Sequence, residues 1–237
     1  MQDYTGILEA RIKRTPTVES FRLRLLSKPD FIPGQFLRVL LDPAIPAGRE
    51  LNKYLSFSSA PARAYIEFTK RLSESEFSKR LKALKPGDRV VLKAPMGNCV
   101  FKNEYRKIGF LIGGIGITPV ISIIEHIALN GLGTDVNLIY SNKVEEEVAF
   151  KSDLDTWMAQ NPGIKIYYCL DSPAPASAVG YHIGMMDADL IKTYMPDYAE
   201  RTIFIFGPPK MVEIVKSLCI GLSCSADKLK IENFTGY

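Results

Sequence analysis

The sequence predicts two domains of different class: an antiparallel β-barrel over residues 1–103 and an α/β domain with a parallel sheet over residues 104–237. The first half contains short, often alternating segments of β-branched and aromatic residues, separated by turn signals. The second half alternates apolar strand-like runs with helical patterns, which is typical of a parallel sheet with helices on both faces. The boundary falls in the polar stretch Lys102–Arg106.

The spacing of the segments in the first half is typical of a small antiparallel barrel. In Phe21–Leu25, apolar residues alternate with arginines, as expected for a half-buried strand. One helical segment, Glu74–Leu84, interrupts the strands and carries its apolar residues on one face. The six expected strands are Tyr4–Lys13, Val18–Leu26, Phe36–Leu41, Tyr54–Ser58, Tyr65–Thr69 and Arg89–Leu92.

The second half begins with the apolar run Ile108–Ile112, which predicts a strand buried on both faces. Helices are expected from Pro119, near Val148–Met158, from about Ala188 and over Met211–Cys219. The remaining expected strands are Val136–Tyr140, Ile164–Leu170, Thr202–Phe206 and Leu229–Phe234.

A glycine loop follows the first of these strands: Gly113-Gly114-Ile115-Gly116, then Thr118-Pro119. Thr118 is a good N-cap, and Pro119 suits the first helical position, where a missing N–H costs nothing. Unpaired N–H groups and the positive end of the helix dipole favour a phosphate or pyrophosphate at such a loop. The usual dinucleotide fingerprint is absent, because Pro119 stands where that motif requires glycine.

A second corner, Phe206-Gly207-Pro208-Pro209-Lys210-Met211, joins the fourth strand of this half to a helix. In open α/β sheets, ligands bind at the carboxyl ends of the strands. The corner alone is equally compatible with a tight connection. Paired with the glycine loop, it favours a binding site.

Composition excludes several classes of protein. The net charge of +4 comes without a dense basic block, so no nucleic-acid partner is expected. No apolar run reaches 18 uninterrupted residues and the N-terminus has no signal-peptide core, so we expect a cytoplasmic protein without a membrane span. No metal site is expected either, because the chain has only two histidines and no CxxC pair. Free thiols are expected at Cys99, Cys169, Cys219 and Cys224.

The glycine loop and the second corner together resemble the nucleotide domain of ferredoxin–NADP reductase-type flavoenzymes. Pro33-Gly34-Gln35-Phe36 is similar to an early PGQF turn of that family, and Pro95-Met96-Gly97-Asn98 resembles the turn that closes its barrel. Glu232-Asn233-Phe234 resembles its closing E-x-F. The resemblance therefore covers nearly the whole chain. It implies an FAD-binding barrel domain over residues 1–103 and an NAD(P)-binding domain over residues 104–237.

The flavin motif of this family, R-x-Y-S/T, corresponds to Lys53-Tyr54-Leu55-Ser56. Lys53 keeps a positive charge for a flavin phosphate but lacks the bidentate fork of arginine. Leu55 replaces the tyrosine that stacks on the flavin. Tyr54, one place earlier in a strand, is expected on the opposite face. The resemblance places the Ser56 hydroxyl near the flavin N5.

Further site residues are implied by the same resemblance. The backbone around Thr69 would hold the flavin, and Ser78 would bind its pyrophosphate at a helix start. Phe206 stands where many relatives place a cysteine beside the nicotinamide. Phe234 or Tyr237 would cover the flavin.

The coenzyme would be held by both nucleotide motifs. The resemblance assigns its pyrophosphate to Gly113, Gly114, Gly116 and Thr118. The nicotinamide end would be shaped by Gly207 and Pro208. After the second strand of this half, Ser141, Asn142 and Lys143 provide a hydroxyl, an amide and a positive charge, which tolerate a 2′-phosphate and favour NADPH. Glu145–Glu147 follow closely and leave NADH open.

The implied activity is hydride transfer from NADPH or NADH to FAD, followed by electron transfer to a separate acceptor. That acceptor would be a ferredoxin-like protein or a small molecule. Two alternatives stay open: an electron-transfer subunit of a larger redox complex, and a non-enzymatic nucleotide-binding module without flavin.

Overall fold

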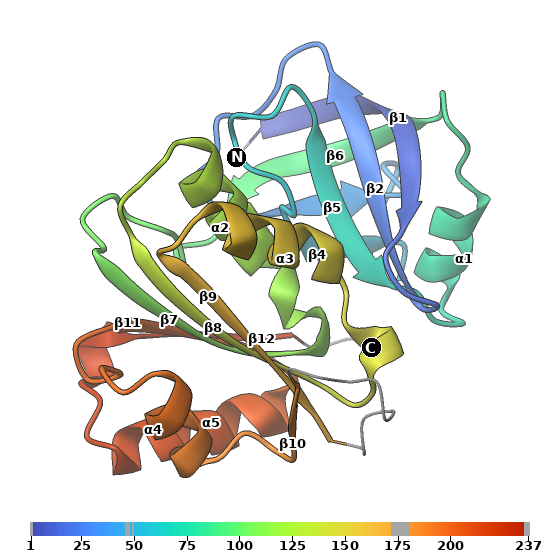
Figure 1. Cartoon of the computed structure of the whole chain (residues 1–237). Helices are drawn as coiled ribbons and strands as arrows, with labels where there is room; N and C mark the ends of the chain where they lie inside the picture. The colour runs from blue at the N-terminus through green and yellow to red at the C-terminus, as the bar shows by residue number, and fades with distance from the viewer. Residues whose placement is uncertain (1, 46–47, 49, 172–180, 235–237) are drawn as a thin grey trace. The chain divides into compact units, whose positions relative to one another are not determined.

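The computed structural model describes residues 2–45, 48, 50–171 and 181–234, which fold into two compact units (Figure 1). The first, here the barrel unit, comprises the chain up to Phe101 together with Thr118–His126. The second, here the sheet unit, comprises Lys102–Ile117 and the chain from Ile127 onward.

The barrel unit is a six-stranded antiparallel sheet with the order β4-β3-β6-β1-β2-β5. Its two edge strands meet through a bridge between Phe57 and Phe68 and through a 2.7 Å bond from Ser58 N to Glu67 O, so the barrel is nearly closed. The elements are β1 (Gln2–Lys13), β2 (Val18–Leu25), β3 (Phe36–Leu40), β4 (Asn52–Ser56), β5 (Ile66–Arg71), α1 (Glu76–Ala83) and β6 (Arg89–Met96).

The barrel core is built by the alternation that the sequence shows. Phe21 and Phe68 lie on neighbouring strands with their rings stacked 5.3 Å apart, and Phe77 of α1 joins the same fully buried cluster. Part of α2 (Ile117–Leu129) is anchored to this unit, because the buried Glu125 accepts bonds from Ala60 N (2.6 Å) and from the Arg63 guanidinium (2.6 Å).

The sheet unit is a six-stranded parallel sheet with the order β10-β9-β8-β7-β11-β12. In Figure 1, α4 and α5 cover one face of this sheet and α3 lies on the other. Its elements are β7 (Lys107–Gly113), η1 (Gly114–Gly116), β8 (Asp135–Asn142), η2 (Glu145–Glu147), α3 (Lys151–Gln160), β9 (Ile164–Leu170), β10 (Tyr181–Ile183), α4 (Ala188–Tyr194), β11 (Thr202–Gly207), α5 (Pro209–Gly221), η3 (Ala226–Lys228) and β12 (Leu229–Asn233).

The predicted fold class is confirmed, and the differences are local. β6 continues to Met96 because it pairs with β1 on one side and β3 on the other. The helix expected near Val148 begins only at Lys151, since Phe150 before it has φ +62°. The strand β10 was not expected, because three half-exposed residues are too short for a periodic signal.

Among the described residues, no helix is long and apolar enough to cross a membrane. The same part of the chain contains no group of three or more His, Cys, Asp or Glu side chains that could hold a metal ion. Cys99, Cys169, Cys219 and Cys224 form no disulfide, and the last three are buried.

Candidate functional site

The two glycine motifs of the sheet unit are in direct contact. β7 ends at Gly113 and passes into the short turn η1, where Gly114 has φ +51°. A Cβ added to Gly116 would lie 2.5 Å from the carbonyl oxygen of Phe206 and 2.9 Å from the nitrogen of Gly207. Only glycine lets the two backbones approach this closely.

The packing continues on both sides of this contact. A Cβ on Gly207 would lie 2.8 Å from the Met211 sulfur and 3.3 Å from Gly113 N. Pro208 is the N-cap of α5, so it sets the corner from which this helix starts. Thr118 is buried in the first turn of α2. Its expected N-cap role is wrong, because η1 leads directly into a helix that begins at Ile117.

The end of β8 lies beside this glycine edge, since Ser141 is the ladder partner of Gly113. Ser141 is half-buried and Lys143 is exposed. Between them, Asn142 is 5% exposed, and neither polar atom of its side-chain amide finds a hydrogen-bond partner among the described residues. A buried amide without partners is costly, so this position fits a ligand that supplies them. Sequence reasoning named Asn142 as an amide that tolerates a 2′-phosphate, but it did not foresee that this amide is buried without a hydrogen-bond partner among the described residues.

Phe206 and Phe234 lie close together at the end of β11. The Phe206 side chain is fully buried, and its ring centroid is 6.4 Å from that of Phe234. Phe234 N donates a 2.9 Å hydrogen bond to Gly207 O, which fixes the closing E-x-F motif on the glycine corner. The position of Phe206 favours a packing role, and Phe234 is half-buried. Tyr237 lies outside the described residues.

Glu232 belongs to the closing E-x-F motif, but the sequence analysis gave it no role in the site. It stands opposite Phe206 in the β11–β12 ladder, one residue before Asn233 pairs with Gly207. Burial raises the pKa of Glu232 to about 7. A carboxyl group with this pKa holds and releases a proton near neutral pH, which suits general acid–base work. The signal in the sequence was the E-x-F motif itself.

The predicted flavin motif lies on β4 of the barrel unit. Leu55 packs against the barrel core, whereas Tyr54 is 60% exposed, so the two side chains occupy opposite faces as expected. Tyr54 makes an edge contact with Phe36 at 5.8 Å and lies 5.2 Å from the Arg38 guanidinium. Ser56 ends the strand and is buried.

Three cations gather where β4 and β5 face each other. Burial lowers the pKa of Lys70, and the nearby charges of Lys53 and Arg71 lower it further. Lys70 Nζ donates a 2.9 Å hydrogen bond to Arg71 O, and an anion bound beside these cations would favour their charged forms. This arrangement fits the phosphates of a flavin nucleotide. The sequence analysis gave the strand around Thr69 a role for its backbone only, and the structure adds the charge of Lys70.

The hydroxyls of Thr69 and Ser78 are engaged within the protein. Thr69 Oγ1 lies 2.7 Å from both Ser20 Oγ and Ser58 Oγ, in a buried chain of hydroxyls. Ser78 Oγ accepts from Ser73 N at 3.1 Å and from Ser75 Oγ at 3.1 Å, at the start of α1. Ser75 has φ −65°, a backbone conformation that needs no glycine. These hydroxyls shape the backbone around the site.

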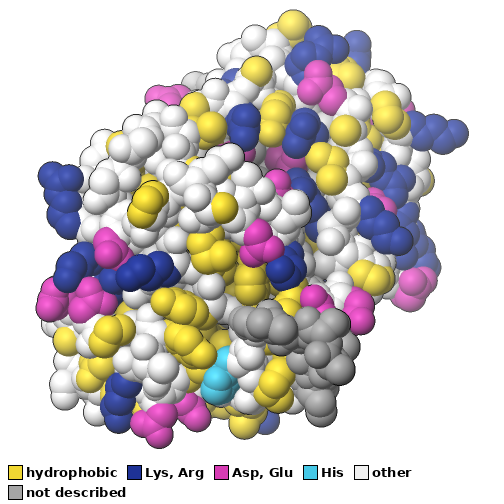
Figure 2. Space-filling model, in the orientation of Figure 1, with side chains coloured by type: hydrophobic (Ala, Val, Ile, Leu, Met, Phe, Trp, Pro, Cys, Tyr) yellow, Lys and Arg dark blue, Asp and Glu magenta, His cyan; other side chains and the backbone are white. Residues whose placement is uncertain are grey.

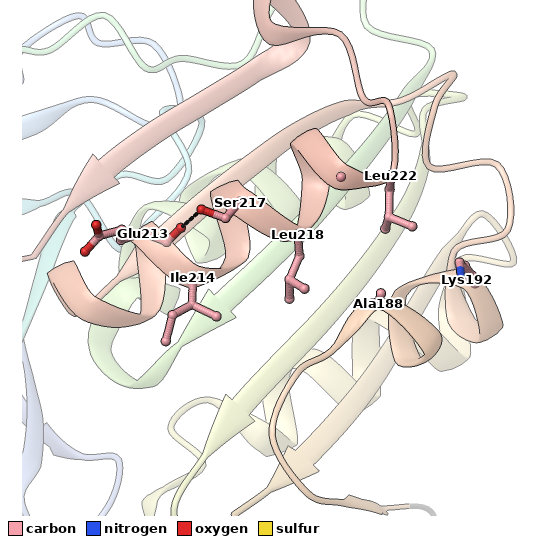
Figure 3. A pocket seen from close by; sticks show the side chains of 8 residues that line it. Ala188, Lys192, Glu213, Ile214, Ser217, Leu218 and Leu222 are labelled. Atoms are coloured by element: carbon pink, nitrogen blue, oxygen red, sulfur yellow. Dashed lines mark hydrogen bonds between the residues drawn. The ribbon is translucent and has the colours of Figure 1, made fainter.

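A groove of about 680 Å³ lies elsewhere in the sheet unit, between α4 and α5. Figure 3 shows Ile214, Leu218 and Leu222 of the α5 side facing Ala188 and Lys192 of α4. None of the predicted cofactor residues lines it. The groove is therefore separate from the candidate site.

Comparison with known proteins shows which family the chain belongs to. A family model described as "Oxidoreductase NAD-binding domain" matches residues 110–217. NADH-cytochrome b5 reductase 1 of Mortierella alpina is 33% identical over 216 residues, which cover 88% of this chain and 71% of that protein. The chain belongs to the ferredoxin–NADP reductase-like family of oxidoreductases, with NADH-cytochrome b5 reductases as relatives. The resemblance inferred from the motifs is confirmed.

A second relative and a solved structure are also similar to this chain. NADH-cytochrome b5 reductase 2 of Mycosarcoma maydis is 32% identical over 171 residues, but the chain spans only 48% of that relative's length. A solved ferredoxin NADP+ reductase from Neisseria gonorrhoeae, with bound FAD and NADP, has a TM-score of 0.83 at 19% identity. That match covers 98% of this chain and 99% of the other, and it shows the two-domain fold. FAD and a nicotinamide coenzyme are the cofactors of the family.

Gly116→Ala tests the contact between the glycine motifs. We expect the free energy of unfolding to fall by about 1–3 kcal/mol, because the added methyl meets backbone atoms that cannot move aside independently. Denaturant titration measures this change. Gly133→Ala is the matched control, since nothing lies within 4 Å of its Cβ, and it should change stability little. Equal stabilities of the two variants would contradict the close contact.

Glu232→Gln tests the raised pKa of the carboxyl group. The folded protein binds this proton more tightly than the unfolded chain, so the stabilisation is complete below about pH 4.5 and is lost as pH rises through about 7. Relative to the variant, the wild type should lose up to about 3 kcal/mol of unfolding free energy between pH 4.5 and 8. Denaturant titrations across this range check it, and parallel pH profiles would refute it.

Proposed function

We propose that this chain is an NADH-dependent flavin reductase, which binds FAD on the barrel unit and NADH on the sheet unit. The observation that carries this proposal is the contact between the two glycine motifs. This contact brings residues that are far apart in sequence together at one edge of the parallel sheet. The 33% sequence identity with an NADH-cytochrome b5 reductase over 88% of the chain supports this proposal. When bound, NADH supplies a hydride to the flavin, which then releases electrons singly to an acceptor.

The protein's share of the reaction is binding and orientation. On the sheet unit, the backbone of Gly113, Gly114 and Gly116 would meet the coenzyme pyrophosphate, with Thr118 in the helix turn that follows. Gly207 and Pro208 would shape the nicotinamide end. The unpartnered amide of Asn142 would bind a polar group of the coenzyme, beside Ser141 and Lys143.

On the barrel unit, the positive charges of Lys53, Lys70 and Arg71 would hold the flavin phosphates. Ser56 would lie near the flavin N5, and the strand around Thr69 would follow the flavin with its backbone. Ser78 would support the pyrophosphate loop through its hydrogen bonds to Ser73 and Ser75. Leu55 and Tyr54 lie on opposite faces of β4, so only one of them would contact the flavin ring.

Residues at the end of β12 would bind a proton and pack over the reacting edge. Glu232 would hold or release a proton at its carboxyl oxygen near neutral pH. Phe234, bonded to Gly207 O, would shield the reacting edge from water, and Phe206 would support it from within the core.

The acceptor we propose is an acidic one-electron carrier of the cytochrome b5 class. The barrel unit contains 18 Lys and Arg against 11 Asp and Glu, a net charge of +7, whereas the sheet unit has 12 against 15. Figure 2 shows Lys and Arg side chains gathered over the barrel unit. Such a field steers an acidic partner toward this unit. The relatives' names give cytochrome b5 as acceptor, so we propose it ahead of the ferredoxin suggested by the motifs.

The deciding experiment is the visible spectrum of the purified protein after addition of FAD. We expect bound flavin that NADH bleaches under anaerobic conditions faster than NADPH does. A protein that stays colourless would support the flavin-free module instead. Asn142→Leu provides the internal test: the NADH concentration for half-maximal bleaching should rise about tenfold, because the amide bonds are lost. FAD absorbance should stay the same.

A second experiment distinguishes the acceptors. Electron transfer from NADH to cytochrome b5 should slow several-fold as ionic strength rises from about 0.01 to 0.15 M, because salt screens the steering charges. A neutral quinone is the control acceptor, and its reduction should be insensitive to salt. Salt-independent transfer to cytochrome b5, or faster transfer to an acidic ferredoxin under the same conditions, would refute the proposed partner.

A further inference from the structure

Two of the four cysteines lie together at the far end of α5. Cys219 is in the last turn of this helix and Cys224 follows in the turn that leads to η3 and β12. Since α5 starts at the Gly207 corner, Cys219 lies roughly 15 Å along the helix from the coenzyme edge. The proposed reaction uses neither thiol.

The local backbone brings the two side chains together. Cys224 N donates a 2.9 Å hydrogen bond to Cys219 O, and the chain reverses through Ser223, which has φ +62°. The two thiol groups are themselves hydrogen-bonded. The two sulfurs therefore belong to one local turn, and a bond between them would not link separate helices or strands.

The two thiols differ in access and in ionisation. Cys219 is fully buried, and burial raises the pKa of its thiol to about 12. Cys224 is 8% exposed; burial raises its pKa, while the Cys219 thiol and Lys228 act in the opposite direction. Because a thiolate is the attacking species, the more accessible Cys224 is the better first nucleophile. Cys219 is hydrogen-bonded to it and is therefore placed to resolve a mixed disulfide on Cys224.

We propose that Cys219 and Cys224 form a redox-active dithiol, which a low-molecular-weight disulfide such as oxidised glutathione converts to an intramolecular disulfide. The Cys224 thiolate attacks one sulfur of the oxidant, forming a mixed disulfide and releasing one thiol. Cys219 then attacks the Cys224 sulfur, closes the bond and releases the second thiol. The two cysteines lose two electrons and two protons in total, and the oxidant gains them. An excess of free thiol reverses both steps.

The reaction can be followed through the mass of a single tryptic peptide. Trypsin cleaves after Lys216 and Lys228, so residues 217–228 form one peptide that contains Cys219, Cys224 and no other cysteine. The folded full-length protein is treated with oxidised glutathione, alkylated and digested. We expect this peptide to lose the mass of two hydrogen atoms, to resist alkylation and to recover both thiols after reduction. Its rate of closure should rise with pH.

Single variants separate the two roles. Cys219→Ala should trap a glutathione adduct on Cys224, whereas Cys224→Ala should leave Cys219 unmodified. Thermal unfolding of each variant confirms that the reaction is read on folded protein. The half-buried Cys99 is the internal control for non-specific modification.

The proposal would be overturned if the peptide kept two alkylatable thiols while Cys99 reacted, if it carried two glutathione adducts, or if Cys169 took part in the bond. None of these measurements involves FAD or NADH, so the result is independent of the proposed reductase activity.

Discussion

The structure of the sheet unit depends on one close approach, that of the Gly116 backbone to the Phe206–Gly207 peptide. Any side chain at residue 116 would occupy space that backbone atoms already fill. This contact holds the end of β7 against the end of β11, and Gly113 and Gly207 extend it around the Met211 sulfur. Two loops about ninety residues apart thereby become one edge of the sheet. The glycines serve packing as much as ligand access, and both follow from the missing Cβ.

The barrel unit brings several positive charges near one another. Lys53, Lys70 and Arg71 stand where the edge strands β4 and β5 face each other; burial lowers the pKa of Lys70, and the charges of Lys53 and Arg71 lower it further. Around them, serine and threonine hydroxyls bond to one another and fix the backbone. Under the proposed function, binding by charge and backbone would let the family motif tolerate Lys53 and Leu55 in place of its arginine and tyrosine.

Much of the fold and family was open to prediction because it rests on local pattern. Alternation in the first half and apolar runs broken by glycine and proline in the second gave the strands to within a few residues. The start of α2 was misplaced by two positions, at Pro119 instead of Ile117, because η1 has no sequence signature that separates it from the helix. The site residues were named from motifs, yet the unpartnered amide of Asn142, the lowered pKa of Lys70 and the raised pKa of Glu232 were not foreseen. Their properties arise from burial and neighbouring charge, which adjacent sequence does not encode.

The sequence by itself determined the two-domain class, the nucleotide loops and the family, because these depend on turn residues and on periodicity along the chain. Only the tertiary structure decided that Gly116 meets Phe206, that Asn142 is buried without a bonding partner among the described residues, and that Cys219 and Cys224 touch. The reason is physical. A close contact, a desolvated amide and a shifted pKa are properties of the space between segments, and that space exists only after the chain has folded.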